Sequence, residues 1–263
     1  MDVWKSQKIV SDQCMQGQIG PLRLWLRQAD DEMRIAVERI EDTEGILETK
    51  VFEPIKGSEP EGLDWGRWVV GKNADTIKLI PLTPDRPLVV RPEVPLKIPT
   101  NHEALFFVSF PIWVRIVADK PRQLNLCEVP SVVLSNIWFG DPMSGELCYS
   151  LRSRARRKIN NSEPSPHRAI CPVRIRNSSM KQLDVERFCV HVEHLKIYDG
   201  SDKLWTNEIS ITFKGESEVS QLKYAQSPPT FEPVQNVISE ARIPLKKPLM
   251  KRSLSDFKLF SGA

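Results

Sequence analysis

The sequence predicts an all-β fold of the antiparallel β-sandwich type, built either as one pair of packed sheets or as two packed β subdomains. Twenty-one prolines and twelve glycines interrupt the 263-residue chain, which leaves long helices little room. Between these breaks lie short runs that alternate apolar and polar residues, the period typical of a strand with one buried face. The composition, 40% hydrophobic and 27% charged, is that of a folded soluble protein.

The first elements form a predicted hairpin. In residues 22–27 the leucines fall on one face and Arg23, Trp25 and Arg27 fall on the other, as a period of two requires. Met33, Ile35 and Val37 repeat the alternation after the polar residues 29–32. A short polar connection between two alternating runs predicts a β-hairpin.

Further strands follow at short intervals along the chain. They are expected at about residues 48–55, 65–71, 76–82, 86–98, 104–118, 124–129, 133–139, 145–155, 169–176, 184–198, 204–214 and 219–225. Prolines 87, 92, 95 and 99 mark the 86–98 strand as an edge or crossover strand, because proline cannot donate to a ladder. The run 106–116 is apolar almost throughout, which predicts a strand covered on both faces with a bend at Pro111.

Residues 188–198 change the phase of their alternation. The apolar positions are 188, 190 and 192, and then 195 and 197. One inserted residue restores both sets to one face, so we expect a β-bulge near Glu193 and His194.

The polar, proline-bearing segment 119–123 is the predicted boundary between an N-terminal β subdomain (1–119) and a C-terminal one (120–225). Residues 226–263 form a proline-containing basic tail with one candidate helix, roughly Val234 to Arg242. The longest apolar run, residues 104–118, is too short and too polar to be a transmembrane helix, and the start of the chain is not typical of a secretory signal. Five widely spaced cysteines without a C-x-x-C pair favour a reducing cytoplasm.

The most informative feature is a charge cluster. Residues 151–181 contain nine Lys or Arg residues and one acid, a local charge of +8 in a chain of net charge +3. Such a field attracts anionic partners. We expect an anion-binding face made of Arg152, Arg154, Arg156, Arg157, Lys158 and Arg168. If residues 145–155 are extended, alternate arginines project from one side at intervals of about 6.7 Å.

The leading interpretation is therefore a non-enzymatic binding or regulatory module, with no cofactor, that engages an anionic protein or a membrane-surface group. Nucleic acid is the less favoured anion, since no stacking aromatic motif accompanies the arginines. A solvated face that pairs with the acidic segment 28–64 is the structural alternative. Self-association is a further possibility, because opposed charged regions favour it.

A small-molecule or metal-dependent hydrolase-like enzyme is the alternative function. One candidate site is the turn from Asp141 to Glu146, where two carboxylates suit acid and base roles. As structure alone, this segment predicts a hairpin turn beside a core Trp138. The other candidate is the strand face of Cys189, His191 and Glu193 with nearby His194, whose side chains suit zinc. Because the sequence has no C-x-x-C pair and no second histidine cluster to complete a zinc site, a polar, solvent-facing strand surface is the favoured interpretation of these residues.

Several strings resemble a prokaryotic family known only as domain of unknown function 432. They include Arg86-Pro87, Pro111-Ile112-Trp113, Trp138-Phe139-Gly140-Asp141-Pro142, Gly145-Glu146-Leu147-Cys148-Tyr149, Cys171-Pro172-Val173 and Leu204-Trp205-Thr206-Asn207. The resemblance covers about residues 20–225. It implies no established activity, cofactor or catalytic residue.

Overall fold

The protein is built of strands. The computed structural model describes residues 2–40, 49–55, 59–72, 74–120, 123–159, 165–215, 220–234 and 236–245. In these ranges the only helical elements are two single 3₁₀ turns, η1 (Asp2–Trp4) and η2 (Val192–His194), and no helix is long and apolar enough to cross a membrane. The predicted all-β class is confirmed, whereas the sandwich-type packing stays a prediction.

The chain divides into two compact units, and each is discontinuous in sequence. Unit 1 contains residues 1–82, 111–133 and 164–167, and unit 2 contains residues 83–110, 134–163 and 168–263. The sequence suggested contiguous subdomains with a boundary at 119–123, but that segment joins two antiparallel neighbours of a single sheet in unit 1. The division of the chain in the structure therefore differs from the division expected from the sequence.

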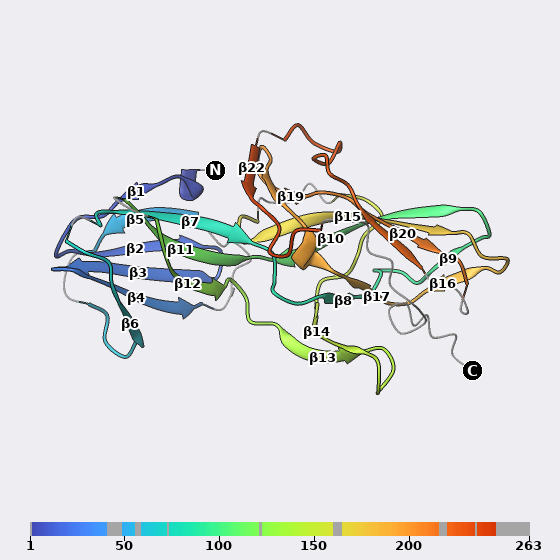
Figure 1. Cartoon of the computed structure of the whole chain (residues 1–263), viewed down its shortest axis with the longest axis horizontal. Helices are drawn as coiled ribbons and strands as arrows, with labels where there is room; N and C mark the ends of the chain where they lie inside the picture. Colours follow the sequence, from blue (N-terminus) through green and yellow to red (C-terminus); the bar gives the residue numbers. More distant parts are fainter. Residues whose placement is uncertain are drawn as a thin grey trace. The chain divides into compact units, whose positions relative to one another are not determined.

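Unit 1 holds two antiparallel sheets (Figure 1). The first has the order β1 (Gln7–Lys8), β7 (Thr76–Leu82), β11 (Trp113–Lys120) and β12 (Leu124–Pro130). The second has the order β5 (Thr49–Pro54), β2 (Cys14–Ile19), β3 (Leu22–Ala29), β4 (Glu32–Arg39) and β6 (Trp65–Val69). The predicted hairpin is confirmed as β3 and β4, and its turn places Asp30 in the left-handed region at φ 54°. Leu22, Leu24 and Leu26 are fully buried.

Unit 2 holds the other sheets. The largest has the order β21 (Gln221–Tyr224), β20 (Ile209–Phe213), β15 (Arg168–Asn177), β19 (Leu204–Thr206), β18 (Ile197–Asp199) and β22 (Asn236–Ser239), and β10 (Glu103–Pro111) also pairs with β15. A four-stranded sheet has the order β13 (Ser135–Phe139), β14 (Glu146–Ser150), β8 (Leu88–Val90) and β17 (Phe188–Val190). A small sheet pairs β16 (Leu183–Val185) with β9 (Leu96–Ile98). We call the four-stranded sheet the β13–β17 sheet.

Two predictions about prolines had different outcomes. The expected break near Pro111 is present, since β10 ends at Pro111 and β11 begins at Trp113. The edge or crossover strand expected at 86–98 is two short strands in different sheets: β9 is an edge of the two-stranded sheet, but β8 lies between β14 and β17 in the interior of its sheet, so the edge prediction is wrong for β8. The reason is that Pro87 and Pro92 lie outside β8, so its three residues are free to pair on both sides.

Two further predictions require correction. The phase change at 188–198 is not a bulge, because the chain leaves β17 and makes the 3₁₀ turn η2 before β18 begins. The helix expected at 234–242 is also wrong, since residues 236–239 form β22, which pairs with β18. Its central Val237 and Ile238 are β-branched and suit a strand. The rest of the predicted tail, residues 246–263, lies outside the described residues.

Candidate functional site

One face of the β13–β17 sheet brings together some of the reactive side chains that the sequence singled out. In the register of the sheet, Ile137 lies opposite Cys148 and Phe139 lies opposite Glu146. Val89 of β8 lies opposite both Ser150 of β14 and Cys189 of β17. Because alternate residues of a strand share a face, these side chains project to the same side of the sheet. Val89, Phe139, Cys148 and Cys189 form one buried cluster there, with Ile137 packed against it.

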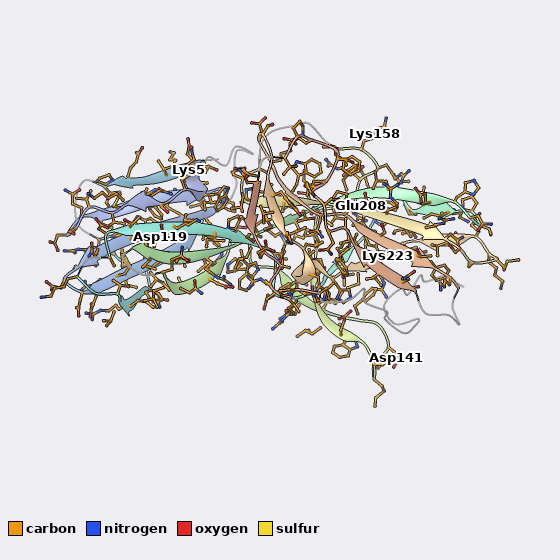
Figure 2. All side chains as sticks on the ribbon, turned by 45° about the horizontal axis from the view of Figure 1, so that its top comes forward. Lys5, Asp119, Asp141, Lys158, Glu208 and Lys223 are labelled. Atoms are coloured by element: carbon orange, nitrogen blue, oxygen red, sulfur yellow. The ribbon has the colours of Figure 1, made fainter. Side chains whose placement is uncertain are left out.

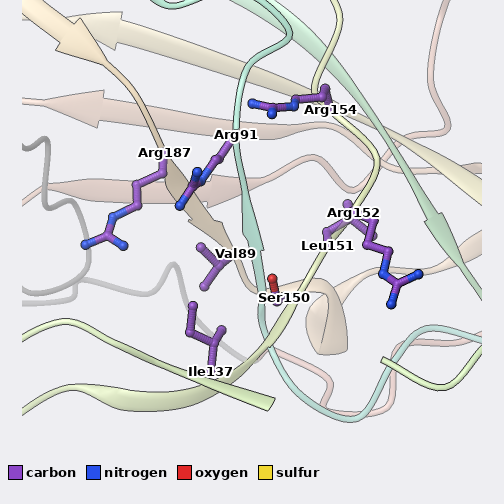
Figure 3. A pocket seen from close by; sticks show the side chains of 8 residues that line it. All are labelled: Val89, Arg91, Ile137, Ser150, Leu151, Arg152, Arg154 and Arg187. Atoms are coloured by element: carbon purple, nitrogen blue, oxygen red, sulfur yellow. The ribbon is translucent and has the colours of Figure 1, made fainter. Parts of the chain in front are cut away.

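Arginines gather at one end of this face, which we call the arginine end. They line a pocket of about 310 Å³ (Figure 3). The lining residues are Val89, Arg91, Ile137, Ser150, Leu151, Arg152, Arg154 and Arg187. In Figure 3, Arg91 and Arg187 extend on the same side of Val89, and Arg152 extends from the side of Ser150. None of the eight lining residues is acidic.

The arginines of the pocket differ in their surroundings. Arg91, Arg152 and Arg154 are exposed, and none of them has an ion pair with a carboxylate among the residues the structure describes. Arg187 is half-buried and its guanidinium lies over the Phe139 ring, 5.6 Å from its centroid. Each guanidinium group carries five N–H donors, so four arginines around one pocket offer many donors to a bound anion.

The other predicted anion-binding residues are placed elsewhere. Arg156 lies 3.5 Å from Glu93 in an exposed ion pair. Arg157 donates to the Leu105 carbonyl and lies over the Phe106 ring, while Lys158 is exposed (Figure 2). Since β14 ends at Ser150, the arginines after it do not lie along a regular strand, and the expected even strip is replaced by a pocket.

Arg168 is a structural residue. Its guanidinium donates to Ser109 through Nε and Nη2 and to the Ser153 hydroxyl at 2.7 Å. Burial lowers the pKa of Arg168 to about 10. These hydrogen bonds hold β15 to β10 and to the segment after β14, so this arginine is bound within unit 2.

The opposite end of the face, which we call the acid end, brings together Glu146, Cys189 and His191. One possible ligand atom from each lies within 4.8 Å of the others. His191 Nε2 lies 3.2 Å from Glu146 Oε1, and the Cys189 thiol lies 3.9 Å from the same oxygen. In the sequence, the Asp141–Glu146 turn and the Cys189 face are separate candidate sites, whereas in the structure Glu146 of the turn lies beside Cys189 and His191.

A second carboxylate supports His191 from the other side. Glu193 Oε1 lies 3.1 Å from His191 Nδ1 and 3.6 Å from His194 Nε2. Burial disfavours the charged imidazole, but the hydrogen bonds to Glu146 and Glu193 outweigh it and raise the pKa of His191 to about 9. Glu193 Oε2 is buried without a hydrogen-bond partner among the described residues. Burial and the nearby Glu193 charge raise the pKa of Tyr224 as well.

Two thiols meet between the two ends. Cys148 Sγ lies 3.8 Å from Cys189 Sγ, and both residues are buried. Burial raises the pKa of Cys189 well above its usual range, and neighbouring Cys148, Glu146 and Glu193 raise it further. Cys171 lies apart on β15 and is fully buried.

The Asp141 turn is confirmed as a hairpin connection, but its tryptophan is not in the core. Asp141 lies near the tip of the β13–β14 hairpin and accepts a hydrogen bond from the Met143 amide (Figure 2). Trp138 is 51% exposed, because it alternates with buried Phe139 and so projects from the other face. Asp141 is exposed, whereas Glu146 is half-buried at the start of β14, and their pairing as acid and base stays a prediction.

Sequence reasoning missed Arg91 and Arg187 as partners of Arg152 and Arg154. Their spacing could have pointed to them, because Arg91 lies two residues after Val89 and Arg187 lies two residues before Cys189, and Val89 and Cys189 face the same side of the sheet. This spacing is informative only once β8 is known to lie in the interior of the sheet, between β14 and β17.

The comparisons with known proteins give a family and nothing more specific. No curated protein and no solved structure among those compared matches the chain. The family model described as "Protein of unknown function (DUF432)" matches residues 3–259. Because this match spans nearly the whole sequence and agrees with the resemblance noted above, the chain belongs to that family.

Proposed function

We propose that this protein is a non-enzymatic binding or regulatory module that binds an anionic group in the pocket at the arginine end. One observation carries the proposal: four arginine residues line one pocket that has no acidic lining residue. Positive charge gathered around one pocket attracts an anion. Phosphate and carboxylate groups suit the pocket because guanidinium binds both with paired hydrogen bonds.

The size and lining of the pocket narrow the chemical class. A volume of about 310 Å³ is at the lower limit of small-molecule sites. Val89, Ile137 and Leu151 supply an apolar wall beside the charges. None of the lining residues is aromatic, so the pocket lacks the stacking platform typical of single-stranded nucleic-acid sites. The favoured ligand is a phosphate-bearing group of small size, either free or displayed on a protein or a membrane surface.

The test uses pyrophosphate as the probe and isothermal titration calorimetry on the full chain. The double variant Arg91→Gln/Arg154→Gln removes two exposed guanidinium groups of the pocket, and the matched control Arg176→Gln removes an exposed arginine of β15. Charge-assisted hydrogen bonds are strong, so the double variant is expected to weaken binding by at least about tenfold. The control is expected to leave it unchanged.

Two further binding experiments distinguish a membrane surface from a protein as the carrier of the phosphate group. Vesicles of anionic phospholipid test a membrane surface, and a phosphorylated peptide tests a protein partner. Binding that depends on Arg91 and Arg154 in any arm supports the pocket. Binding that the double variant and the Arg176→Gln control weaken equally shows diffuse charge and overturns the proposal, as does absence of binding in all arms at low salt.

A further inference from the structure

We infer that the acid end of the β13–β17 sheet is a zinc site, with Glu146, Cys189 and His191 as ligands. The three side chains come from β14, from β17 and from the residue directly after β17. The inference is independent of the anion pocket, and it assigns a role to residues that the proposed function does not use. Thiolate, imidazole and carboxylate together are a donor set typical of zinc in proteins.

The distances between the donor atoms fit a tetrahedral ion. With zinc–nitrogen and zinc–oxygen bonds of about 2.1 Å, an imidazole nitrogen lies about 3.4 Å from a carboxylate oxygen in a tetrahedral site. His191 Nε2 and Glu146 Oε1 are 3.2 Å apart, and the ligand atoms of Glu146, Cys189 and His191 all lie within 4.8 Å of one another. The separation of 3.9 Å between Cys189 Sγ and Glu146 Oε1 is slightly longer than the expected value of about 3.6 Å.

The contacts around His191 also fit a metal ligand. An imidazole that binds metal through one nitrogen usually donates its other N–H group to a carboxylate, which fixes the ring. Glu193 Oε1 accepts from His191 Nδ1 at 3.1 Å and leaves Nε2 directed to Glu146. The carboxylates of Glu146 and Glu193 contact the two nitrogens of the His191 ring, and the Cys189 thiol lies near Glu146, so oxygen, nitrogen and sulfur donors meet at one point.

A disulfide between the two thiols is the rival explanation, and the sheet argues against it. β8 lies between β14 and β17, so the two strands are separated by two strand spacings, about 9.5 Å. A disulfide requires Cα atoms no more than about 7 Å apart. An ion accommodates the present sulfur separation, whereas a disulfide requires the strands to move.

The test measures zinc and cobalt binding by the full chain without an affinity tag. After dialysis against a chelator, the protein is expected to take up one zinc per chain in equilibrium dialysis. Cobalt is expected to give the visible spectrum of a tetrahedral site together with thiolate charge-transfer absorption, and zinc is expected to abolish both. Zinc is also expected to raise the melting temperature, because it binds the folded state.

Variants assign the ligands. Glu146→Gln changes a partly exposed residue and preserves its shape, and Cys189→Ser removes the thiol. Each variant is expected to weaken zinc binding by more than about 100-fold. Substitution of a residue that only supports a metal ligand already lowers metal affinity by about 10-fold to 100-fold, and loss of a ligand itself should cost more. Cys127→Ser on β12 of unit 1 is the matched thiol control and is expected to bind as the unchanged protein does.

Three outcomes overturn the inference. They are less than about one zinc per ten chains, a cobalt spectrum without thiolate absorption, or retention of zinc by Glu146→Gln and Cys189→Ser alike. The first two are measured on the unchanged protein, so the inference stays testable even if Cys189→Ser does not fold.

Discussion

The two ends of one sheet face differ in how their charges are compensated. At the arginine end, Arg91, Arg152 and Arg154 are exposed and have no carboxylate partner among the described residues. At the acid end, His191 lies between Glu146 and Glu193, and the groups are buried or half-buried. Both ends are carried by β14, β8 and β17 or by the residues next to these strands.

This difference gives the two ends different roles, one in binding external partners and the other in the stability of the fold. Exposed cations without partners cost the fold little and remain available to an external anion. Buried charged groups are tolerated only when each has a partner, so the acid end has to satisfy itself or bind a cation. The face therefore offers an exposed surface that can bind an anion at one end and a buried group of side chains that can bind a cation at the other.

The largest expected effect comes from the residue that touches both ends. Phe139 is 1% exposed, lies opposite Glu146 in the register and has the Arg187 guanidinium over its ring. Phe139→Ala is expected to lower the free energy of unfolding by about 3–5 kcal/mol, because it leaves a cavity in the buried cluster. Urea denaturation followed by circular dichroism measures this.

Trp138→Ala is the neighbouring control on the opposite face. Its ring is 51% exposed, so the expected cost is below about 1 kcal/mol, although it is the larger side chain. Similar losses for Phe139→Ala and Trp138→Ala would contradict the assignment of the two faces.

The fold class was readable from the sequence because strand patterns are local. The alternation of Leu22, Leu24 and Leu26, and its continuation in residues 33–37, identifies β3 and β4 without any tertiary information. The position of β8 was not readable, since whether a strand is central or at an edge depends on its pairing partners. The four residues between Pro87 and Pro92, three of which form β8, carry no signal of β14 or β17 as neighbours.

The candidate site was only partly readable for the same reason. Cys189, His191 and Glu193 were found from their spacing, but the 3₁₀ turn η2 determines that Glu193 turns back to His191. Glu146 joins them through pairings that cross 40 or more residues of sequence. Likewise, Arg152 and Arg154 were identified from local charge, whereas Arg91 and Arg187 contribute only through the sheet.

The next prediction tests the acid end by removing one charge. Glu193 is 7% exposed and contacts His191 and His194. Glu193→Gln is expected to lower the free energy of unfolding by about 1–3 kcal/mol, because a buried charge-assisted hydrogen bond is lost. The measurement is urea denaturation in a chelating buffer, which removes any contribution from bound metal.

Glu240→Gln provides the matched exposed control. Glu240 pairs with Lys196 at 2.8 Å, but its side chain is 68% exposed, so a change of no more than about 0.5 kcal/mol is expected. If the buried and the exposed glutamate cost the same, the acid end does not depend on its internal pairing.

The smallest expected effect on stability comes from giving the arginine end a carboxylate of its own. Ser150 lines the pocket beside Arg152 (Figure 3). Ser150→Asp is expected to change the free energy of unfolding by less than about 1 kcal/mol, because ion pairs with exposed arginines are weak. It is nevertheless expected to abolish pyrophosphate binding, since the new carboxylate neutralises the pocket and repels the probe. Calorimetry measures pyrophosphate binding by Ser150→Asp and by the neutral control Ser150→Asn, which has a side chain of the same shape. Equal affinity in the two variants would show that the anion binds elsewhere. Loss of binding in Ser150→Asp alone would mean that the positive charge of this pocket drives binding.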